Sequence, residues 1–345
     1  MEKTNVFLNI VRFLFPWKGD SVREIIRKLV FIAALITLIF SAASFLKMQL
    51  NEAADKAEND ELREIYSGTG VKIEIPEQKR ETLERENPEV LERFLPLIEI
   101  NSEVAGWLTV GKNKFIDYVV MQGKDNDFYL THNYKKAKSV SGALNIDYRC
   151  ELSAEKRSAN IVIYGHNMGS GAYFGLLPRY FNYDITRDKN DLSFYKSTPT
   201  LNFSTLYKSS EYKIFGGVLV KVNSGNDDFQ YHKVHDFENK AQFDNFCAEI
   251  LDRSTFINPD VDLKYGDNLL TLSTCILSRT YGNCEKRWVI FAREVREGES
   301  PEVDVSKAYA NPSPLFYDEY YAARGGKWQG RGWKEDIIAG YNRKD

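Results

Sequence analysis

Cysteine and histidine are scarce in this sequence, with four of each among 345 residues. The cysteines do not have zinc-site spacing, and His232 and His235 have no third ligand nearby, so we interpret that pair as part of a solvated loop. Basic tracts are absent as well, and 46 Lys and Arg against 49 Asp and Glu leave a net charge of −3. Nucleic acid is therefore not an expected partner. No motif implies a metal ion or an organic cofactor.

One uncharged apolar run, from Leu29 to Leu46, is just long enough to cross a bilayer as a helix. Acidic residues dominate after Lys47, and basic residues lie before the run. The positive-inside rule then puts residues 1–28 in the cytoplasm, makes 29–46 a membrane anchor in contact with lipid, and leaves the rest of the chain outside the cell. The alternative is a cleaved signal peptide, for which Ser41 to Ser44 is only a weak cleavage pattern.

The chain after the anchor divides by composition. Residues 47–87 are rich in charge and poor in apolar residues, which indicates a partly helical extracellular spacer. A short helix is expected from Pro88 to Asn101. Short β-type runs then recur, which favours a mainly β domain with some helix over residues 88–298, either a barrel or a sandwich. One amphipathic helix interrupts them, between about Asn239 and Asp252.

Residues 299–345 form a C-terminal extension that carries tyrosines and tryptophans among glycines and charged residues. The extension either contacts the cell wall or packs its aromatic side chains on the domain, and we favour the packing.

A strand, loop and strand over Leu269 to Glu294 place Cys275 at the end of the first strand and Arg287 at the start of the second. A cysteine nucleophile needs a base or an imidazolium partner, and acyl transfer needs a donor for the oxyanion. His166 follows a buried strand and a glycine, so its ring can project into a cleft. Structural roles are the alternative for each residue, for example an ion pair of Arg287 with Glu285 or Glu294.

Five segments carry distinctive motifs: NSEVAGWLTV at 101–110, IDYVVMQGKDNDFYL at 116–130, GALNIDYR at 142–149, IVIYGHNM at 161–168, and TLSTC at 271–275 followed by Arg287. In this order they resemble the sortases, which are transpeptidases of Gram-positive bacteria, and class B is the most similar group. The resemblance covers roughly residues 88 to 295.

This resemblance implies a sortase-type closed β-barrel with N-terminal helices and one helix in a late strand connection. Cys275 would attack the carbonyl of a threonine in the sorting signal of a secreted protein. His166 would act as acid and base, and Arg287 would stabilise the oxyanion. The acyl-enzyme would then pass to an amine of a peptidoglycan precursor. The residues expected to contact the signal are Asn126, Leu130, Ser273 and Thr274.

One departure from the class concerns the residues after the nucleophile. Some class B members have an acidic pair there, whereas Ile276 and Leu277 follow Cys275 in this chain. Three other functions stay open: a pilus-polymerising sortase that uses a pilin lysine, a cysteine endopeptidase, and a non-catalytic surface scaffold. No lid segment is visible, which disfavours the pilus enzyme.

The other cysteines have structural interpretations. Cys247 lies on the apolar stripe of the predicted helix, as a small buried residue would. Cys150 and Cys284 would either pair with each other, or Cys284 would cap Cys275, because four cysteines allow several pairings outside the cell. We expect Cys275 to be a free thiol and the other three to be structural. His132 is expected to be a hydrogen-bonding loop residue.

Overall fold

The computed structural model divides the chain into two units, residues 1–58 and 59–345, which we describe separately. The residues that the structure describes are 10–69, 76–86, 88–181, 183–184, 189–222, 229–276, 286–323 and 325–327.

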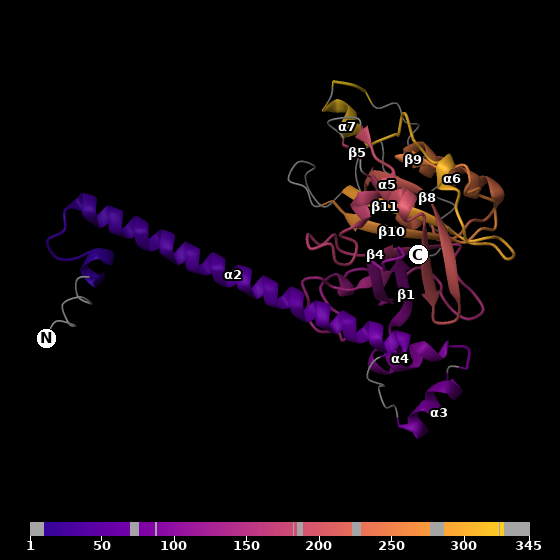
Figure 1. The fold of residues 1–345 in the computed structure, drawn as a ribbon, viewed down its shortest axis with the longest axis horizontal. Coiled ribbons are helices and arrows are strands. Elements are labelled where there is room, and N and C mark those ends of the chain that lie inside the picture. Colours follow the sequence, from indigo (N-terminus) through magenta and orange to yellow (C-terminus); the bar gives the residue numbers. More distant parts are fainter. Residues whose placement is uncertain are drawn as a thin grey trace. The chain divides into compact units, whose positions relative to one another are not determined.

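The first unit contains most of a long helix, α2 (Val22–Ser67) (Figure 1). The apolar side chains of its first half are exposed. Ile36 and Phe40, for example, are 62% and 74% exposed. By length and composition this helix can cross a membrane, and a signal sequence near the N-terminus can have the same length and composition. At the basic end, the Lys28 ammonium donates to Asp20 at 2.7 Å and to the carbonyl of Arg12 at 2.6 Å. A bilayer would cover the exposed side chains.

The last turns of α2 belong to the second unit, although the sequence had placed them in the spacer. Leu62 is fully buried, and Tyr66 stacks on Trp107 with ring centroids 4.2 Å apart. Two helices follow, α3 (Glu77–Glu86) and α4 (Leu95–Ile100), with the 3-10 turn η1 (Glu92–Phe94) between them. The predicted helix at 88–101 is thus shorter than expected.

Eight strands of the second unit close into a barrel, as expected from the resemblance (Figure 1). Their order is β1-β2-β3-β4-β10-β11-β8-β7, and β7 pairs with β1. Two of the pairs, β2 with β3 and β4 with β10, are parallel. The bounds are β1 Val104–Val110, β2 Ile116–Met121, β3 Leu144–Ile146, β4 Asn160–Tyr164, β7 Thr200–Thr205, β8 Ser209–Lys221, β10 Leu269–Cys275 and β11 Lys286–Glu294.

Side chains along these strands alternate between the barrel interior and an outer layer, as the pleat of a strand requires. In β10, Leu270 and Leu272 point into the interior core. Leu269 belongs to the outer core, which also contains Phe246 and Ile250 of α6 (Lys240–Arg253). In β10, a residue an even number of positions from Leu269 therefore points its side chain to the outer face of the barrel.

The helix α6 confirms the helix predicted at 239–252. Asn239 caps its first turn, because its side chain accepts from the backbone N–H of Gln242 at 3.0 Å. The predicted stripe is buried, with Phe243, Phe246 and Cys247 at most 5% exposed. A helix of 14 residues is only marginally stable on its own in water. Here it stays folded because burial of each large apolar side chain stabilises it by about 2 kcal/mol.

Short elements fill the remaining connections. The bounds are η2 Phe128–Leu130, η3 Leu177–Phe181, β5 Tyr183–Asp184, β6 Lys189–Asn190, α5 Ser193–Ser197, η4 Tyr231–Lys233, β9 Phe256–Ile257, η5 Val305–Lys307, β12 Tyr309–Ala310 and α7 Asp318–Ala322.

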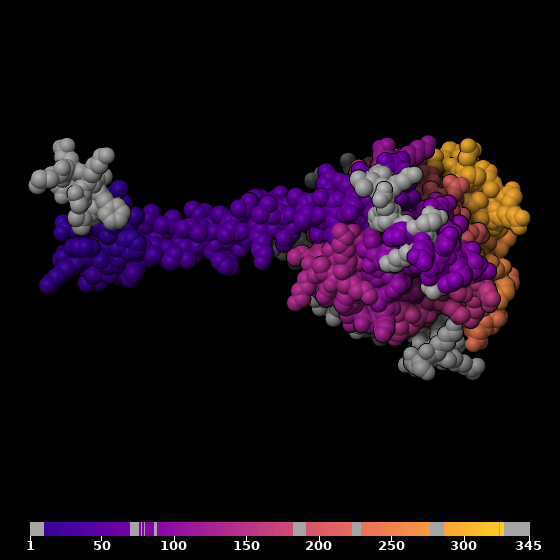
Figure 2. All heavy atoms as spheres, turned by 90° about the horizontal axis from the view of Figure 1, so that it is seen from below, coloured from indigo at the N-terminus to yellow at the C-terminus, as the bar shows by residue number. Residues whose placement is uncertain are grey.

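The C-terminal extension packs aromatic side chains on the domain, as predicted (Figure 2, yellow). Its strand β12 pairs with β9, and Phe316 and Tyr317 are each 3% exposed. Trp328 and Trp333 lie outside the described residues. The extension up to residue 323 is thus part of the packed barrel unit.

Candidate active site

Cys275 and Arg287 face each other across neighbouring strands. Cys275 ends β10, and the antiparallel register pairs it directly with Arg287 on β11. Directly opposed residues project their side chains to the same face of a sheet. Leu269 of β10 and Val289 of β11 belong to the outer core. Cys275 and Arg287 lie an even number of positions from these two residues, so their side chains point to the same outer face.

His166 reaches the same end of the barrel from the other side of Cys275. The parallel register of β4 with β10 pairs Tyr164 with Ser273. Two further contacts continue this pairing, from the N–H of Gly165 to the carbonyl of Ser273 at 3.2 Å and from the Thr274 hydroxyl to the carbonyl of Gly165 at 2.8 Å. His166 lies two positions after Tyr164, and Cys275 lies two positions after Ser273. The structure therefore brings the three predicted catalytic residues to one end of three adjacent strands.

The His166 ring is oriented by Leu130. Its Nε2 lies 2.7 Å from the carbonyl oxygen of Leu130. A carbonyl can only accept a hydrogen bond, so Nε2 carries a proton and Nδ1 is left to exchange one. Leu130 was predicted to contact substrate, and what the structure shows for it is this backbone contact with the histidine.

Asn167 is a site residue that sequence reasoning missed. Its amide Nδ2 donates to the backbone carbonyl of Cys275 at 3.0 Å, which ties the loop after β4 to the end of β10. The only available signal was its position directly after His166 in the GHN triplet.

Ser273 and Thr274 lie beneath this surface. They are 1% and 2% exposed, and the Ser273 hydroxyl is 2.7 Å from the hydroxyl of Tyr231. Burial raises the pKa of Tyr231 to about 12, and the charges of Arg287 and Cys275 also act on this phenol. Both residues therefore support the wall behind the nucleophile, and their predicted contact with substrate stays a prediction.

Asn126 supports a buried carboxylate near the site. Its side chain donates to Asp147 at 3.0 Å, and Tyr164 and Arg149 donate to the same carboxylate at 2.8 and 2.7 Å. Burial tends to raise the pKa of Asp147, but the hydrogen bonds from Arg149, together with the His235 ring 3.7 Å away, outweigh it and hold that pKa far below its usual range. Asp147 was not singled out from sequence, although it lies within the GALNIDYR segment. A contact of Asn126 with substrate stays a prediction.

Cys275 differs from the other described cysteines in its surroundings. It is partly exposed, whereas Cys150 and Cys247 are buried thiols. Burial raises the pKa of Cys150 to about 12 and raises that of Cys247 as well. The expected alternative of a disulfide between Cys150 and Cys284 is wrong, because Cys150 is a thiol directed at the carbonyl of Asn160. Cys284 itself lies outside the described residues.

Within the described ranges, no group of three or more His, Cys, Asp or Glu side chains is placed so that it could hold a metal ion. His132 is a loop residue as predicted, with Nδ1 2.9 Å from the carbonyl of Phe128. His232 and His235 are partly buried, so a solvated loop was the wrong interpretation. The buried Tyr231 draws their turn against the outer core.

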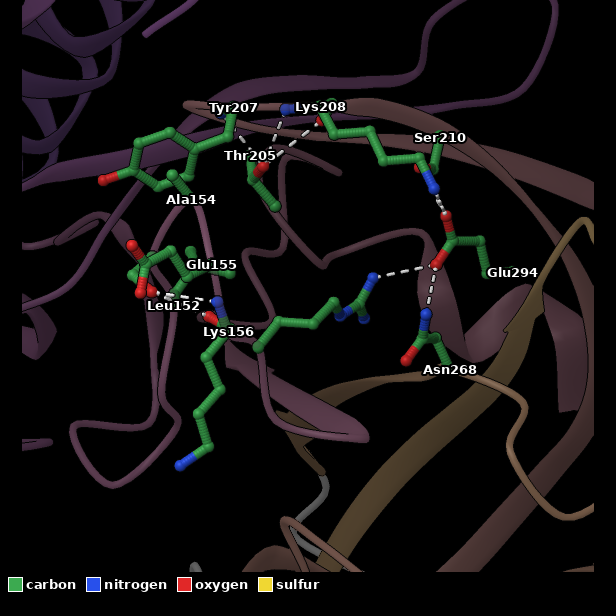
Figure 3. Close-up of a pocket in the computed structure, with 12 residues that line it drawn as sticks. Leu152, Ala154, Glu155, Lys156, Thr205, Tyr207, Lys208, Ser210, Asn268 and Glu294 are labelled. Carbon is green, nitrogen blue, oxygen red and sulfur yellow. Dashed lines mark hydrogen bonds and ion pairs between the residues drawn. The ribbon is translucent and has the colours of Figure 1, made fainter. Parts of the chain in front are cut away.

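A polar depression with a volume of about 140 Å³ lies at the opposite end of β10 and β11 (Figure 3). Lys208 and Asn268 point at Glu294 and donate to it at 2.6 and 2.8 Å. Arg157 and Ser210 complete the set of donors at 3.0 and 2.7 Å. The carboxylate is thus bound by the protein itself, and this depression is separate from the end that holds Cys275.

Comparison with known proteins gives consistent results. No protein-family model matches the chain. The chain is 32% identical over 195 residues to Sortase B of Listeria monocytogenes, which covers 56% of this chain and 72% of that protein. It is 28% identical over 204 residues to Sortase B of Staphylococcus aureus, and this match covers 59% of this chain and 75% of that protein.

Two solved structures have the same fold. The crystal structure of sortase B from B. anthracis in complex with AAEK1 covers 72% of this chain and 99% of its own, with 25% identity and a TM-score of 0.55. The Staphylococcus aureus sortase B-substrate complex has the same coverage and identity and a TM-score of 0.54.

Proposed function

The chain belongs to the class B sortases, which are cysteine transpeptidases, and from this membership we propose that Cys275 is the nucleophile that attaches a secreted protein to the cell wall. One observation carries the proposal. Cys275 ends its strand with Arg287 directly opposite on one neighbour and with His166 at the matching end of the other. A nucleophile, a proton carrier and a cationic donor on one face meet the needs of acyl transfer.

In the first half-reaction, the Cys275 thiolate attacks the carbonyl carbon of a threonine in the sorting signal. Arg287 donates N–H groups to the oxyanion of the tetrahedral intermediate. The protonated imidazole of His166 gives a proton to the departing amine, and the peptide bond breaks. A thioester between Cys275 and the threonine remains.

In the second half-reaction, an amine of a peptidoglycan precursor attacks the thioester. His166 accepts a proton from this amine, the new amide forms, and Cys275 leaves as thiolate. The Leu130 carbonyl supports these steps, because it binds Nε2 and leaves Nδ1 for the proton transfers.

The location we propose follows from the apolar part of α2. Residues 29–46 would anchor the protein in the cell membrane in a single pass, with 1–28 in the cytoplasm and the barrel outside. The exposure of that apolar face supports an anchor. Protease treatment of intact cells should remove the barrel and protect the N-terminal segment, whereas full protection of the barrel would overturn this orientation.

The function is tested with the full chain in detergent. We would mix it with a library of threonine-containing pentapeptides, with and without triglycine as the amine, and identify products by mass spectrometry. The expected product is a new amide after threonine that needs both the amine and Cys275. Ligation to a lysine side-chain amine in preference to triglycine would indicate a pilus polymerase. Hydrolysis alone with every amine would indicate an endopeptidase, and no acyl-enzyme at all would indicate a scaffold.

A further inference from the structure

The C-terminal extension packs on the barrel end that holds Cys275 and Arg287. Phe316 and Tyr317 form a buried cluster with Leu219 of β8 and with Ile276, the residue after Cys275. Trp288, the residue after Arg287, packs against the same cluster. The extension thus contacts the direct chain neighbours of both site residues.

Backbone contacts dock this extension upstream of the cluster. The strand β12 pairs with β9, and the N–H of Leu315 donates to the carbonyl of Asp252 at 2.9 Å. The Asn311 side chain donates to the carbonyl of Ser254 at 2.8 Å. These bonds hold the extension at the end of α6 and lead it toward α7 (Figure 1).

Glu319 of α7 bridges two buried lysines. Lys221 and Lys286 are paired across β8 and β11 and are 9% and 8% exposed. The Glu319 carboxylate is 2.6 Å from the Lys221 ammonium and 3.3 Å from that of Lys286. Directly opposed like charges destabilise a sheet, and buried ones do so more strongly unless a counter-charge is present. Glu319, whose own side chain is 52% exposed, supplies one such counter-charge, and the Tyr317 ring adds a cation–π contact 4.6 Å from Lys286.

Lys286 transmits this restraint to the site through its backbone. Its carbonyl accepts from the Arg287 guanidinium at 3.2 Å and from the N–H of Ile276 at 3.3 Å. One peptide group therefore touches both Arg287 and the residue that follows the nucleophile. A shift of Lys286 would move the guanidinium relative to Cys275.

We propose that the C-terminal extension is a positioning element of the enzyme, in which Glu319 acts through Lys286 to hold the Arg287 guanidinium opposite Cys275. This inference rests on the proposed role of Arg287 and adds to it a residue outside the resemblance. Glu319 does not touch the reacting atoms. Its removal should reduce transition-state stabilisation while substrate still binds.

The test is a double-mutant cycle on the full chain in detergent, with Glu319→Gln, Arg287→Lys and the combination. The substrate is the pentapeptide ligated to triglycine in the assay above. Glu319→Gln should lower kcat by about 10-fold with little change in KM, less than the roughly 100-fold that a 1 Å misplacement can cost. In the Arg287→Lys background the same change should cost less than about 2-fold, because the guanidinium is already absent.

Controls separate positioning from general stability. Glu302→Gln changes an exposed glutamate of the same extension and should leave kcat and melting temperature unchanged. Glu319→Asp, which keeps the charge on a shorter side chain, should fall between wild type and Glu319→Gln. This variant also serves if the glutamine variant fails to fold.

Two results would overturn the proposal: an unchanged kcat in Glu319→Gln, or an equal loss in the wild-type and Arg287→Lys backgrounds. The proposed role of Arg287 fails in a different way, namely if Arg287→Lys itself retains normal turnover, and the proposed function fails if no wild-type ligation product forms.

Discussion

At the scale of single residues, position 287 requires a planar guanidinium if Arg287 holds the oxyanion. Lysine offers only a mobile point charge there. Arg287→Lys should therefore keep the melting temperature and lower turnover by roughly 100- to 1000-fold, as loss of one oxyanion donor does. If Arg287 were only an ion-pair partner, lysine would retain much of the turnover, and Arg287→Ala would lose stability and activity together. Melting curves and acyl-transfer rates of the three proteins distinguish these cases.

The cysteines give a second test at this scale. Cys275→Ala should abolish the thioester that mass spectrometry detects on the wild type. Cys247→Ala should keep substantial turnover and lose some stability, because truncating a buried side chain leaves a small cavity. Cys150→Ala, a second buried thiol, is the matched control. Normal thioester formation in Cys275→Ala would remove this residue from the mechanism.

At the scale of elements, the last turns of α2, from residue 59 on, belong to the barrel unit. Leu62 packs in one core with Phe94 and Trp107, and Tyr66 stacks on Trp107. A chain that starts at Asn59 keeps these contacts, whereas one that starts at Gly70 loses them. Removal should cost about 3 kcal/mol and lower the melting temperature by roughly 6 to 12 °C.

Calorimetry of these two truncated chains checks the prediction. Equal melting temperatures would show that residues 59–69 are a spacer with no part in the folded unit. Both chains should keep the spatial arrangement of Cys275, His166 and Arg287, because the contacts of Leu62 and Tyr66 do not involve these three residues.

At the scale of the whole molecule, the dependence of stability on pH reports on His232, a partly buried histidine that feels the charges of Asp147 and Arg149. Burial, aided by the charge of Arg149, lowers the pKa of His232 from 6.5 to about 4. The unfolded chain then binds more protons than the folded one between these values. The stability that the fold gains by holding His232 neutral is therefore fully present above pH 6.5, and it is lost as the pH falls toward 4.

The lowered pKa of His232 corresponds to at most about 3 kcal/mol in the free energy of unfolding. Between pH 7 and pH 4.5 the melting temperature of the wild type should fall more than that of His232→Gln, which has no ring to protonate. His132→Gln, a substitution in an outer loop, is the control and should follow the wild type. Parallel curves for the wild type and His232→Gln would show that His232 is not held neutral by the fold.

Local sequence was sufficient for several features of this protein. The apolar run at 29–46, the stripe of α6 and the strand of Cys275 are periodic or continuous within one element, so short windows display them. The family motifs pointed to the closed barrel and to Cys275, His166 and Arg287 together. Two interpretations were wrong, the Cys150 disulfide and the solvated loop at His232 and His235, because burial depends on what packs on a segment.

Other features were decided only by the tertiary structure. Strand register placed His166 and Arg287 on either side of Cys275, and pairing of β7 with β1 closed the barrel. The contacts of Asn167 with Cys275 and of Glu319 with Lys286 join residues 108 and 33 positions apart. Such pairs leave no periodic signal in the sequence, because their geometry depends on how whole strands align and on which polar groups burial forces together.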